Sequence, residues 1–298
     1  MESKILIENG TNELEVLEFT IAGNSYGINV AKIREIINYQ PVTPVPNAHP
    51  SIEGIFMPRD TMITAVDLSN CLQRGESKPG GLFIVTNFNQ LDIAFHVENV
   101  IGIHRVSWTQ IMKPEATFSN VNDSVSTGIV NINGKLIIIL DFEKIVADIN
   151  PSTGIKVSDL NELGERDRNA IPILFAEDSV LLNKLVKDSL NRAGYTNVIS
   201  CENGEEAWMI LKEAKERGTI SDVARCVITD IEMPRMDGHR LLKLIRDDSE
   251  LGSLPVIIFS SLVNEEMRRK GEALGATAQL SKPEIVNLVK EVDAAVTQ

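Results

Sequence analysis

Four apolar runs in the second half of the chain each lead into a side chain suited to phosphate or metal chemistry. Residues 173–175 precede Glu177-Asp178, 226–229 precede Asp230, 256–259 precede Ser260, and 278–280 precede Lys282. In an open α/β sheet, ligands bind in the crevice outside the carboxyl ends of the strands. We therefore expect these side chains to converge at one edge of a parallel sheet.

The residue types at this edge suit the transfer of a phosphoryl group. A carboxylate such as Asp230 can act as a nucleophile toward phosphorus if cations neutralise the incoming oxygens. Mg²⁺ prefers carboxylates, carbonyls and waters, together with phosphate oxygens. A single acid at the end of a strand is more often a solvated cap. Five groups in order on successive strands indicate one site.

The apolar runs of the second half alternate with amphipathic stretches of helical spacing. The stretches cover the start of a helix after Asp178-Ser179 and the ranges 204–217, 238–247, 264–274 and 284–295. This alternation predicts a (βα)₅ domain with a parallel sheet covered by helices on both faces.

Residues 171–296 resemble the response-regulator receiver domain. The matching motifs are Phe175-Ala176-Glu177-Asp178-Ser179, Thr229 to Pro234, Met236-Asp237-Gly238, residues 255–261 and Ser281-Lys282-Pro283. The resemblance implies a flavodoxin-like fold and phosphorylation of Asp230 by a histidine kinase. It implies Mg²⁺ held by Glu177, Asp178, Asp230 and the backbone carbonyl of Glu232. It also implies that Ser260 and Lys282 contact the phosphoryl group and that the Lys282–Pro283 peptide is cis.

The receiver-like sequence departs from the family pattern at three positions. Glu177 stands where the family often has Asp, and Ser260 replaces the commoner Thr. Gln279 occupies the position where many receivers carry a switching Tyr or Phe. Since Gln279 has no ring to swing inward, we expect the downstream signal to follow another route. We also expect Glu232, two residues after the acceptor, to tune the access of water to the acyl phosphate.

The first half of the chain has a different rhythm, with short strand candidates separated by Gly, Pro and Asn. The candidates are residues 14–21, 26–30, 52–56, 62–66, 82–87, 91–97, 128–132 and 135–140. Asn133-Gly134 predicts a hairpin between the last two strands. We expect helical pieces at 31–37 and 141–147. Many short strands at this spacing predict barrels or a sandwich.

No catalytic constellation is visible in residues 1–150. His49, His96 and His104 have no Cys or acid partners at metal-ligand spacing, so we expect them to be solvated or packed, and His239 likewise. A β-rich domain without visible chemistry is usually a binding module.

Residues 11–148 resemble the CheW-like coupling domain. The resemblance rests on Glu18 to Ile28, residues 30–37, Pro41 to Pro46, Gly54-Ile55, Arg59, Ala65 to Leu68 and residues 134–140. It implies an all-β domain of two SH3-like barrels that docks on the chemotaxis histidine kinase CheA and on the cytoplasmic tips of methyl-accepting chemoreceptors. The family usually has Asn-Leu-Arg-Gly where this chain has Met57-Pro58-Arg59-Asp60. Arg59 is therefore either a partner contact or a structural Arg paired with an acid such as Asp60.

The length of 298 residues allows two domains. We predict a coupling domain over 1–150, a linker over 151–169 that is rich in Pro, Ser, Gly, Asn and charged residues, and a receiver domain over 170–298. The net charge of −13 argues against a general nucleic-acid binder. The first ten residues contain acids and lack the apolar core of a signal peptide, so we do not expect one, and three scattered Cys suit a reducing compartment. We expect a cytoplasmic protein that associates with receptor arrays at the membrane.

A coupling domain followed by a receiver domain resembles the CheV family of chemotaxis scaffold proteins. The resemblance implies an adaptor that links chemoreceptors to CheA, with adaptation feedback through phosphorylated Asp230. The receiver would accept a phosphoryl group and lose it by hydrolysis without acting on a substrate of its own. Two alternatives are a phosphate sink and a response regulator whose coupling domain serves another complex. A haloacid-dehalogenase-like hydrolase is disfavoured, because those enzymes carry their nucleophile on the first strand.

Overall fold

The structure is a computed structural model that describes residues 13–88, 91–112, 125–151, 155, 157–261 and 265–297. The chain divides into two compact units, one built mainly from residues 14–154 and the other mainly from residue 155 onward. None of the helices in the described part of the chain combines the length and apolar character that a membrane span requires.

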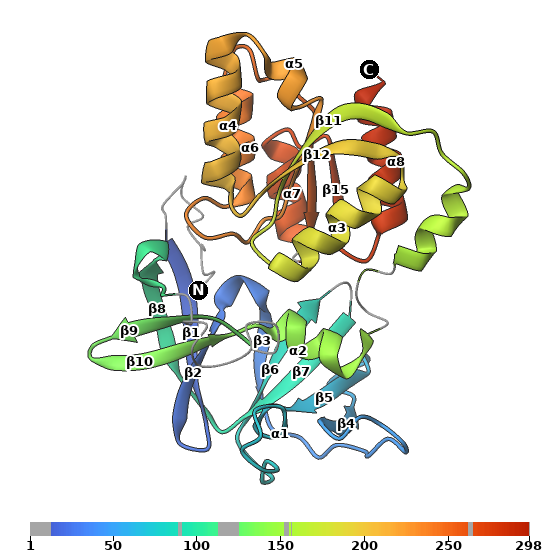
Figure 1. Ribbon diagram of the computed structural model, residues 1–298. Coiled ribbons are helices and arrows are strands. Elements are labelled where there is room, and N and C mark those ends of the chain that lie inside the picture. Colours follow the sequence, from blue (N-terminus) through green and yellow to red (C-terminus); the bar gives the residue numbers. More distant parts are fainter. Residues whose placement is uncertain are drawn as a thin grey trace. The chain divides into compact units, whose positions relative to one another are not determined.

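The first unit contains two five-stranded sheets (Figure 1). One sheet has the order β8 (Asn99–Ser107), β1 (Glu13–Ile21), β2 (Asn24–Asn29), β10 (Lys135–Leu140) and β9 (Ser126–Ile132). The other has the order β3 (Ile33–Asn38), β6 (Leu82–Phe88), β7 (Leu91–Val97), β5 (Ile63–Asp67) and β4 (Ile52–Phe56). The remaining short elements are η1 (Val30–Lys32), α1 (Leu68–Cys71) and η2 (Trp108–Gln110). The predicted β-rich character of the first half is confirmed.

Three apolar clusters form the core of the first unit, and one of them joins its two sheets. One cluster, which includes Val16, Val130 and Ile137, belongs to the first sheet, and another, which includes Ile63 and Phe83, belongs to the second. The third cluster joins strands of both sheets to helix α2 (Phe142–Ile149), whose apolar side is buried against them. The two sheets therefore form one folded body.

The Asn133-Gly134 hairpin between β9 and β10 is confirmed. Both residues have positive φ, +53° and +84°, and the flanking strands pair in antiparallel fashion. Both φ values fall in the range that a type I′ turn requires, which is why this dipeptide is the strongest short hairpin signal.

Two elements of the first unit differ from the sequence-based expectation. The predicted helix over 31–37 is wrong: Ile33–Asn38 forms strand β3, paired with β6. Its half-buried and exposed residues alternate along the strand, which is the period of a strand. Strand β8 was not predicted. It exposes Ile101 and Ile103 on its outer side, so its sequence lacks the alternation of apolar and polar residues that marks a half-buried strand.

The second unit contains a five-stranded parallel sheet in the order β12 (Tyr195–Cys201), β11 (Asn169–Ala176), β13 (Cys226–Thr229), β14 (Val256–Ser260) and β15 (Ala278–Ser281). The chain moves outward in one direction from β11 to β12 and in the other from β13 to β15. The order therefore reverses between β11 and β13, where an open α/β sheet forms its ligand crevice. The predicted (βα)₅ fold is confirmed.

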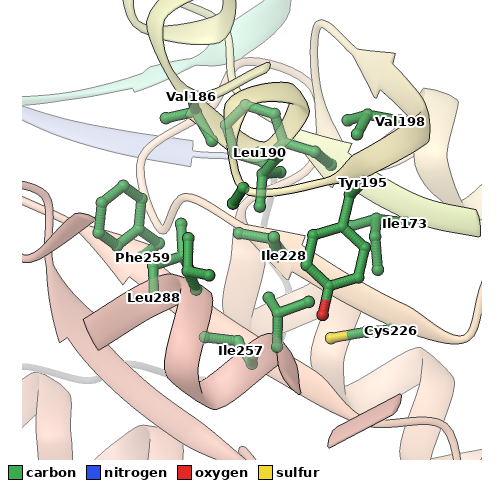
Figure 2. Packing of buried hydrophobic residues seen from close by; sticks show 14 of the residues in the cluster. Ile173, Val186, Leu190, Tyr195, Val198, Cys226, Ile228, Ile257, Phe259 and Leu288 are labelled. Atoms are coloured by element: carbon green, nitrogen blue, oxygen red, sulfur yellow. The ribbon is translucent and has the colours of Figure 1, made fainter. Parts of the chain in front are cut away.

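Helices cover both faces of this sheet. Helices α3 (Val180–Arg192) and α8 (Ile285–Val296) pack over Ile173, Ile228 and Phe259 (Figure 2). Helices α4 (Gly204–Arg217) and α6 (Gly238–Asp247) pack against each other on the other side (Figure 1). Helix α7 (Glu265–Ala273) approaches Ile258 of β14 and Gln279 of β15 at Gly271, and the short α5 (Ile220–Val223) contacts α4 and β11. Side chains of a strand point alternately to the two faces, so continuous apolar runs are needed to satisfy both layers.

Part of the predicted linker packs on the second unit. Residues Val157–Leu163 form the 3₁₀ helix η4, and Leu160 is buried in the cluster that contains α3 and α8. Arg166 donates two hydrogen bonds to Asp293 of α8, at 2.8 and 2.5 Å. This segment is thus attached to the rest of the second unit by both apolar and charged contacts. The domain bounds at 150 and 170 remain a prediction.

Candidate functional site

The topology of the second unit brings the strand-end residues to one edge of the sheet. Ala176, the last residue of β11, pairs with Thr229 of β13, which in turn pairs with Ile258 of β14. Ser260 pairs with Ser281 at the end of β15. Glu177, Asp230, Ser260 and Lys282 therefore all lie where neighbouring parallel strands end, as the sequence predicts.

Three acids form a cluster at this edge. One carboxylate oxygen from each of Glu177, Asp178 and Asp230 lies within 4.8 Å of the other two. Glu177 and Asp230 are 1% and 4% exposed, and Asp178 is half-buried. Carboxylates so close together in a buried place repel one another unless a cation compensates them.

Lys282 supplies one buried positive charge. Its Nζ lies 2.9 Å from Asp230 Oδ2 and 3.0 Å from Glu177 Oε2, and the residue is only 4% exposed. Burial raises the pKa of Glu177 well above its usual value; Lys282 opposes this rise, and Asp230 and Asp178 add to it. One ammonium, in contact with two members of a cluster of three acids, leaves an excess of negative charge.

The donor set fits a hard divalent cation. Mg²⁺ takes oxygen ligands and is commonly bound through one or two carboxylates with waters and phosphate oxygens. Glu177, Asp178 and Asp230 offer three carboxylate groups in one place and carry more charge than Lys282 neutralises. These residues would hold the ion.

The loop after β13 fixes Asp230 in place. The Ile231 N–H donates to Asp230 Oδ1 at 2.7 Å, and the Asp230 N–H donates to the Ala176 carbonyl at 3.0 Å. Gly238, the first residue of α6, packs directly against the Asp230 backbone: a Cβ at this position would lie 1.9 Å from the Asp230 carbonyl oxygen. The side chain of Asp230 is therefore oriented by its own backbone and by the close return of the chain at Gly238.

Ser260, Glu232 and the Lys282–Pro283 peptide were also predicted to belong to this site. Ser260 is 1% exposed at the end of β14, beside the strand that carries Asp230. Glu232 is half-buried, and its carbonyl as a metal ligand remains a prediction. The expected cis peptide at Lys282–Pro283 is wrong, because no cis bond occurs in the described residues. The trans form is the intrinsically favoured one for X–Pro bonds.

Gln279 of β15 contacts helix α7. Its Nε2 donates a hydrogen bond to the Arg268 carbonyl at 2.8 Å. Its Oε1 lies so near Gly271 that a Cβ there would be 2.3 Å away. A polar side chain thus binds the helix backbone at the position where the receiver family often has an aromatic ring.

One residue of the site was missed by the sequence-based reasoning. Asn183, on the first turn of α3, donates through Nδ2 to the carbonyls of Glu177 and Cys201, at 3.1 and 3.3 Å. A carboxamide on the helix that follows the acidic pair is a weak signal, and it acquires meaning only from these contacts.

In the first unit, Arg59 is exposed. Its side chain is 79% accessible, and its Nη2 lies 3.3 Å from Glu35 Oε2. The acid that pairs with Arg59 is therefore Glu35 of β3, and the loose exposed geometry leaves most of the guanidinium accessible. Its role as a partner contact remains a prediction.

The histidines of the first unit were expected to be solvated or packed, and His49 is exposed and His96 buried, but His96 and His104 have acid partners that the sequence did not reveal. His96, 2% exposed, contacts Glu53 at 2.9 Å and the Gly80 carbonyl at 2.6 Å. His104 lies 2.8 Å from the buried Glu18. In each case the acid comes from a strand distant in sequence. His239 of the second unit is also packed, at 3% exposure.

Two family models match the chain. The one described as CheW-like domain matches residues 15–150, and the one described as response regulator receiver domain matches residues 173–293. Each match covers most of one of the two units.

Several curated proteins are similar to the chain. The chemotaxis protein CheV3 of Helicobacter pylori is 29% identical over 297 residues, which cover 94% of each protein. CheV2 of the same organism is 29% identical over 299 residues, 93% of each protein. The chemotaxis protein CheW of Thermotoga maritima is 30% identical over 154 residues, which cover 50% of this chain and 98% of that protein.

Among solved structures, the scaffolding protein TtCheW of Thermoanaerobacter tengcongensis aligns with 43% of this chain and 83% of its own length, at 21% identity and a TM-score of 0.40. The chemotaxis protein CheY4 of Vibrio cholerae aligns with 43% of this chain and with 99% of its own length, at 27% identity and a TM-score of 0.36.

Proposed function

Because the chain belongs to the CheW-like family and carries a response regulator receiver domain in its second half, we propose that it is a chemotaxis adaptor controlled by phosphorylation of Asp230. The observation that carries this proposal is the contact of Lys282 with Asp230 inside a buried cluster of three acids. Such a site suits phosphoryl acceptance, and among the described residues of the other half no catalytic constellation is visible for it to assist.

In the proposed reaction, a carboxylate oxygen of Asp230 attacks the phosphorus of a phosphohistidine on the partner kinase. A P–O bond forms, the P–N bond breaks, and the imidazole leaves with the electron pair. Glu177, Asp178 and Asp230 would hold Mg²⁺, which would supply positive charge to offset the negative charge of the phosphoryl group. Lys282, now paired with Asp230 and Glu177, would pair with a phosphoryl oxygen. The Ser260 hydroxyl would donate to another.

The first unit would perform the coupling. We infer that it binds the kinase CheA and the cytoplasmic tips of chemoreceptors, so the protein works in the cytoplasm at receptor arrays. The similarity to CheW and CheV proteins over these residues supports this inference. A phosphoryl group adds negative charge and acceptor oxygens, which can reorder loops and docked surfaces. The output would be a change in binding, and the protein would be an adaptor without catalytic turnover of a substrate.

Phosphotransfer from a ³²P-labelled chemotaxis kinase tests the proposal. We expect Mg²⁺-dependent labelling of the wild-type chain and of Asp188→Ala, which changes an exposed acid on α3. Labelling should be lost in Asp230→Ala. Equal labelling of Asp230→Ala would overturn the assignment of the acceptor.

Reconstituted receptor–kinase arrays separate feedback from a phosphate sink. Under feedback, kinase activity in the Asp230→Ala arrays fails to return toward its starting level after a stimulus. Under the sink alternative, arrays with the wild type and with Asp230→Ala have the same kinase activity. Only the phosphoryl level on other receivers is then higher with Asp230→Ala. That second outcome would contradict the feedback proposal.

A further inference from the structure

Asn183 closes a small ring of hydrogen bonds around the acidic pair. Its Nδ2 donates to the Glu177 carbonyl, and its backbone N–H donates to the Ser179 carbonyl at 2.8 Å. The Ser179 N–H in turn donates to Glu177 Oε1 at 3.2 Å. Asp178 lies in the chain between Glu177 and Ser179, so its backbone is part of this ring.

The ring is also attached to the sheet. The Cys201 carbonyl, at the end of β12, accepts hydrogen bonds from the Glu177 N–H at 3.1 Å and from Asn183 Nδ2 at 3.3 Å. One carboxamide therefore joins the turn after β11, the first turn of α3 and the end of β12.

The bond to the Glu177 carbonyl has a direct geometric consequence. This carbonyl belongs to the peptide unit that links Glu177 to Asp178, and a peptide unit is planar. Fixing its oxygen restricts the rotation of that plane, and the plane sets the directions in which the two neighbouring side chains leave the backbone. Asn183 thus limits how the two carboxylates can face each other.

We propose that Asn183 is a positioning residue, which holds the Glu177–Asp178 peptide so that both carboxylates face a divalent cation. This inference rests on the proposed function, because that function places the ion there. Mg²⁺ demands near-ideal octahedral geometry, so its affinity is sensitive to the direction of each ligand. Partners that orient ligands typically contribute about 10- to 100-fold to metal affinity.

If Asn183 served only to stabilise helix α3, Asn183→Ala would weaken that helix. Helix α3 already has a cap, since the Ser179 side chain accepts from the Leu182 N–H. Ala at position 183 keeps the backbone bond to Ser179 and has a higher helix propensity than Asn. The helix should therefore persist in Asn183→Ala, and only the attachment of the acidic turn is lost.

Calorimetric titration with Mg²⁺ of the full unphosphorylated chain tests the proposal without any kinase. We expect the Kd of Asn183→Ala to rise about 10-fold or more. The matched control is Asn191→Ala, the same substitution at an exposed position of the same helix, which should bind as the wild type does. Melting temperatures measured without Mg²⁺ monitor folding. Equal Mg²⁺ affinity of the wild type and Asn183→Ala would overturn the positioning role.

A second variant separates orientation from charge. Asn183→Asp keeps the size of the side chain but cannot donate, and it adds a negative charge that attracts Mg²⁺. Weaker binding than the wild type supports positioning, whereas tighter binding would show that charge alone governs the site and would overturn the proposal.

Phosphotransfer measured against Mg²⁺ concentration gives a further readout. The half-saturating concentration should rise in Asn183→Ala, while the rate at saturating Mg²⁺ stays within about twofold, because the reacting groups are intact. A lower saturated rate with unchanged half-saturation would contradict positioning. If the wild type itself binds no Mg²⁺, the metal site of the proposed function fails with it, an outcome distinct from equal binding by wild type and variant.

Discussion

Lys282 Nζ lies 2.9 Å from Asp230 Oδ2 and is the cation found against the buried acids in the described residues of the second unit. The pair joins the end of β15 to the end of β13, strands that are separated by β14 in the sheet. A phosphoryl group on Asp230 would change what this ammonium faces. The Lys282–Asp230 contact is therefore expected to affect both the stability of the second unit and the proposed phosphorylation signal.

Removal of this ammonium should destabilise the second unit. Lys282→Met leaves buried carboxylates without their cation, and breaking a buried pair typically costs about 3–5 kcal/mol. Urea unfolding should show this loss, and it should be smaller with saturating Mg²⁺, which replaces the missing charge. The control is Lys212→Met on the exposed side of α4, for which we expect little change. Equal unfolding midpoints for the two variants would contradict this account.

Gly238→Ala should disturb both stability and phosphorylation. The added Cβ would lie 1.9 Å from the Asp230 carbonyl oxygen. This backbone atom cannot move aside without shifting the Asp230 side chain, the proposed phosphoacceptor. Overpacking of this kind costs about 1–3 kcal/mol. Thermal unfolding and phosphotransfer should both report it. In Gly102→Ala the new Cβ has open space, so that variant should differ little from the wild type.

Gln279→Ala should loosen helix α7. The variant loses the hydrogen bond to the Arg268 carbonyl, a contribution of about 1 kcal/mol, and leaves a space beside Gly271. Amide hydrogen exchange in α7 should become faster, while the exchange of β11 and β13 stays the same. Arg268→Ala keeps the carbonyl and removes an exposed side chain whose ion pair with Glu272, at 3.4 Å on the solvated face of α7, contributes little, so it should leave the exchange of α7 nearly unchanged. Identical exchange in wild type and Gln279→Ala would remove the role of this contact.

Glu18 should make the first unit sensitive to acid. Burial acts to raise the pKa of Glu18, but hydrogen bonds with Ser25, Lys135 and His104 outweigh it and lower the pKa to about 2. A lowered folded-state pKa stabilises the protein above the unfolded pKa near 4.5, and this contribution is lost as the pH falls from 4.5 toward 2.

The comparison of wild type with Glu18→Gln checks this dependence. The difference in the free energy of unfolding should be roughly 2 kcal/mol at pH 7, allowing for solvent screening at the exposed Lys135, and should shrink at pH 3. A difference that does not change with pH would assign the effect of the variant to packing.

Glu232→Ala should change the lifetime of the acyl phosphate. The half-buried Glu232 follows Asp230 by two residues, where its side chain can affect the approach of water. The rate of loss of ³²P from the isolated phosphorylated chain measures this effect. Unchanged kinetics would rule out the proposed influence of Glu232, whereas Asp188→Ala should retain the wild-type rate.

Most of the second unit could be predicted, because the sequence patterns that mark its helices and strands are local. The bounds of α4 and α6 match their predicted ranges, since a capping residue and an amphipathic period mark each helix. The meeting of Glu177, Asp230 and Lys282 followed from topology, because parallel strands end at one edge.

The remaining features depend on contacts between distant parts of the chain. Residues 31–37 contain aliphatic side chains at both helical and strand spacing, and only the pairing of β3 with β6 decides between them. His96 meets Glu53 across 43 residues, and His104 meets Glu18 across 86. No local pattern encodes such pairs. The contacts of Asn183 likewise require the positions of three elements at once.

The attachment of η4 to the second unit limits the length of chain that connects the two units. Between Ile149, where α2 ends, and the buried Leu160, about ten residues remain, which span at most roughly 35 Å. A tether of this length keeps each unit at a millimolar effective concentration relative to the other. A partner protein bound to one unit is therefore presented to the other unit at this raised effective concentration.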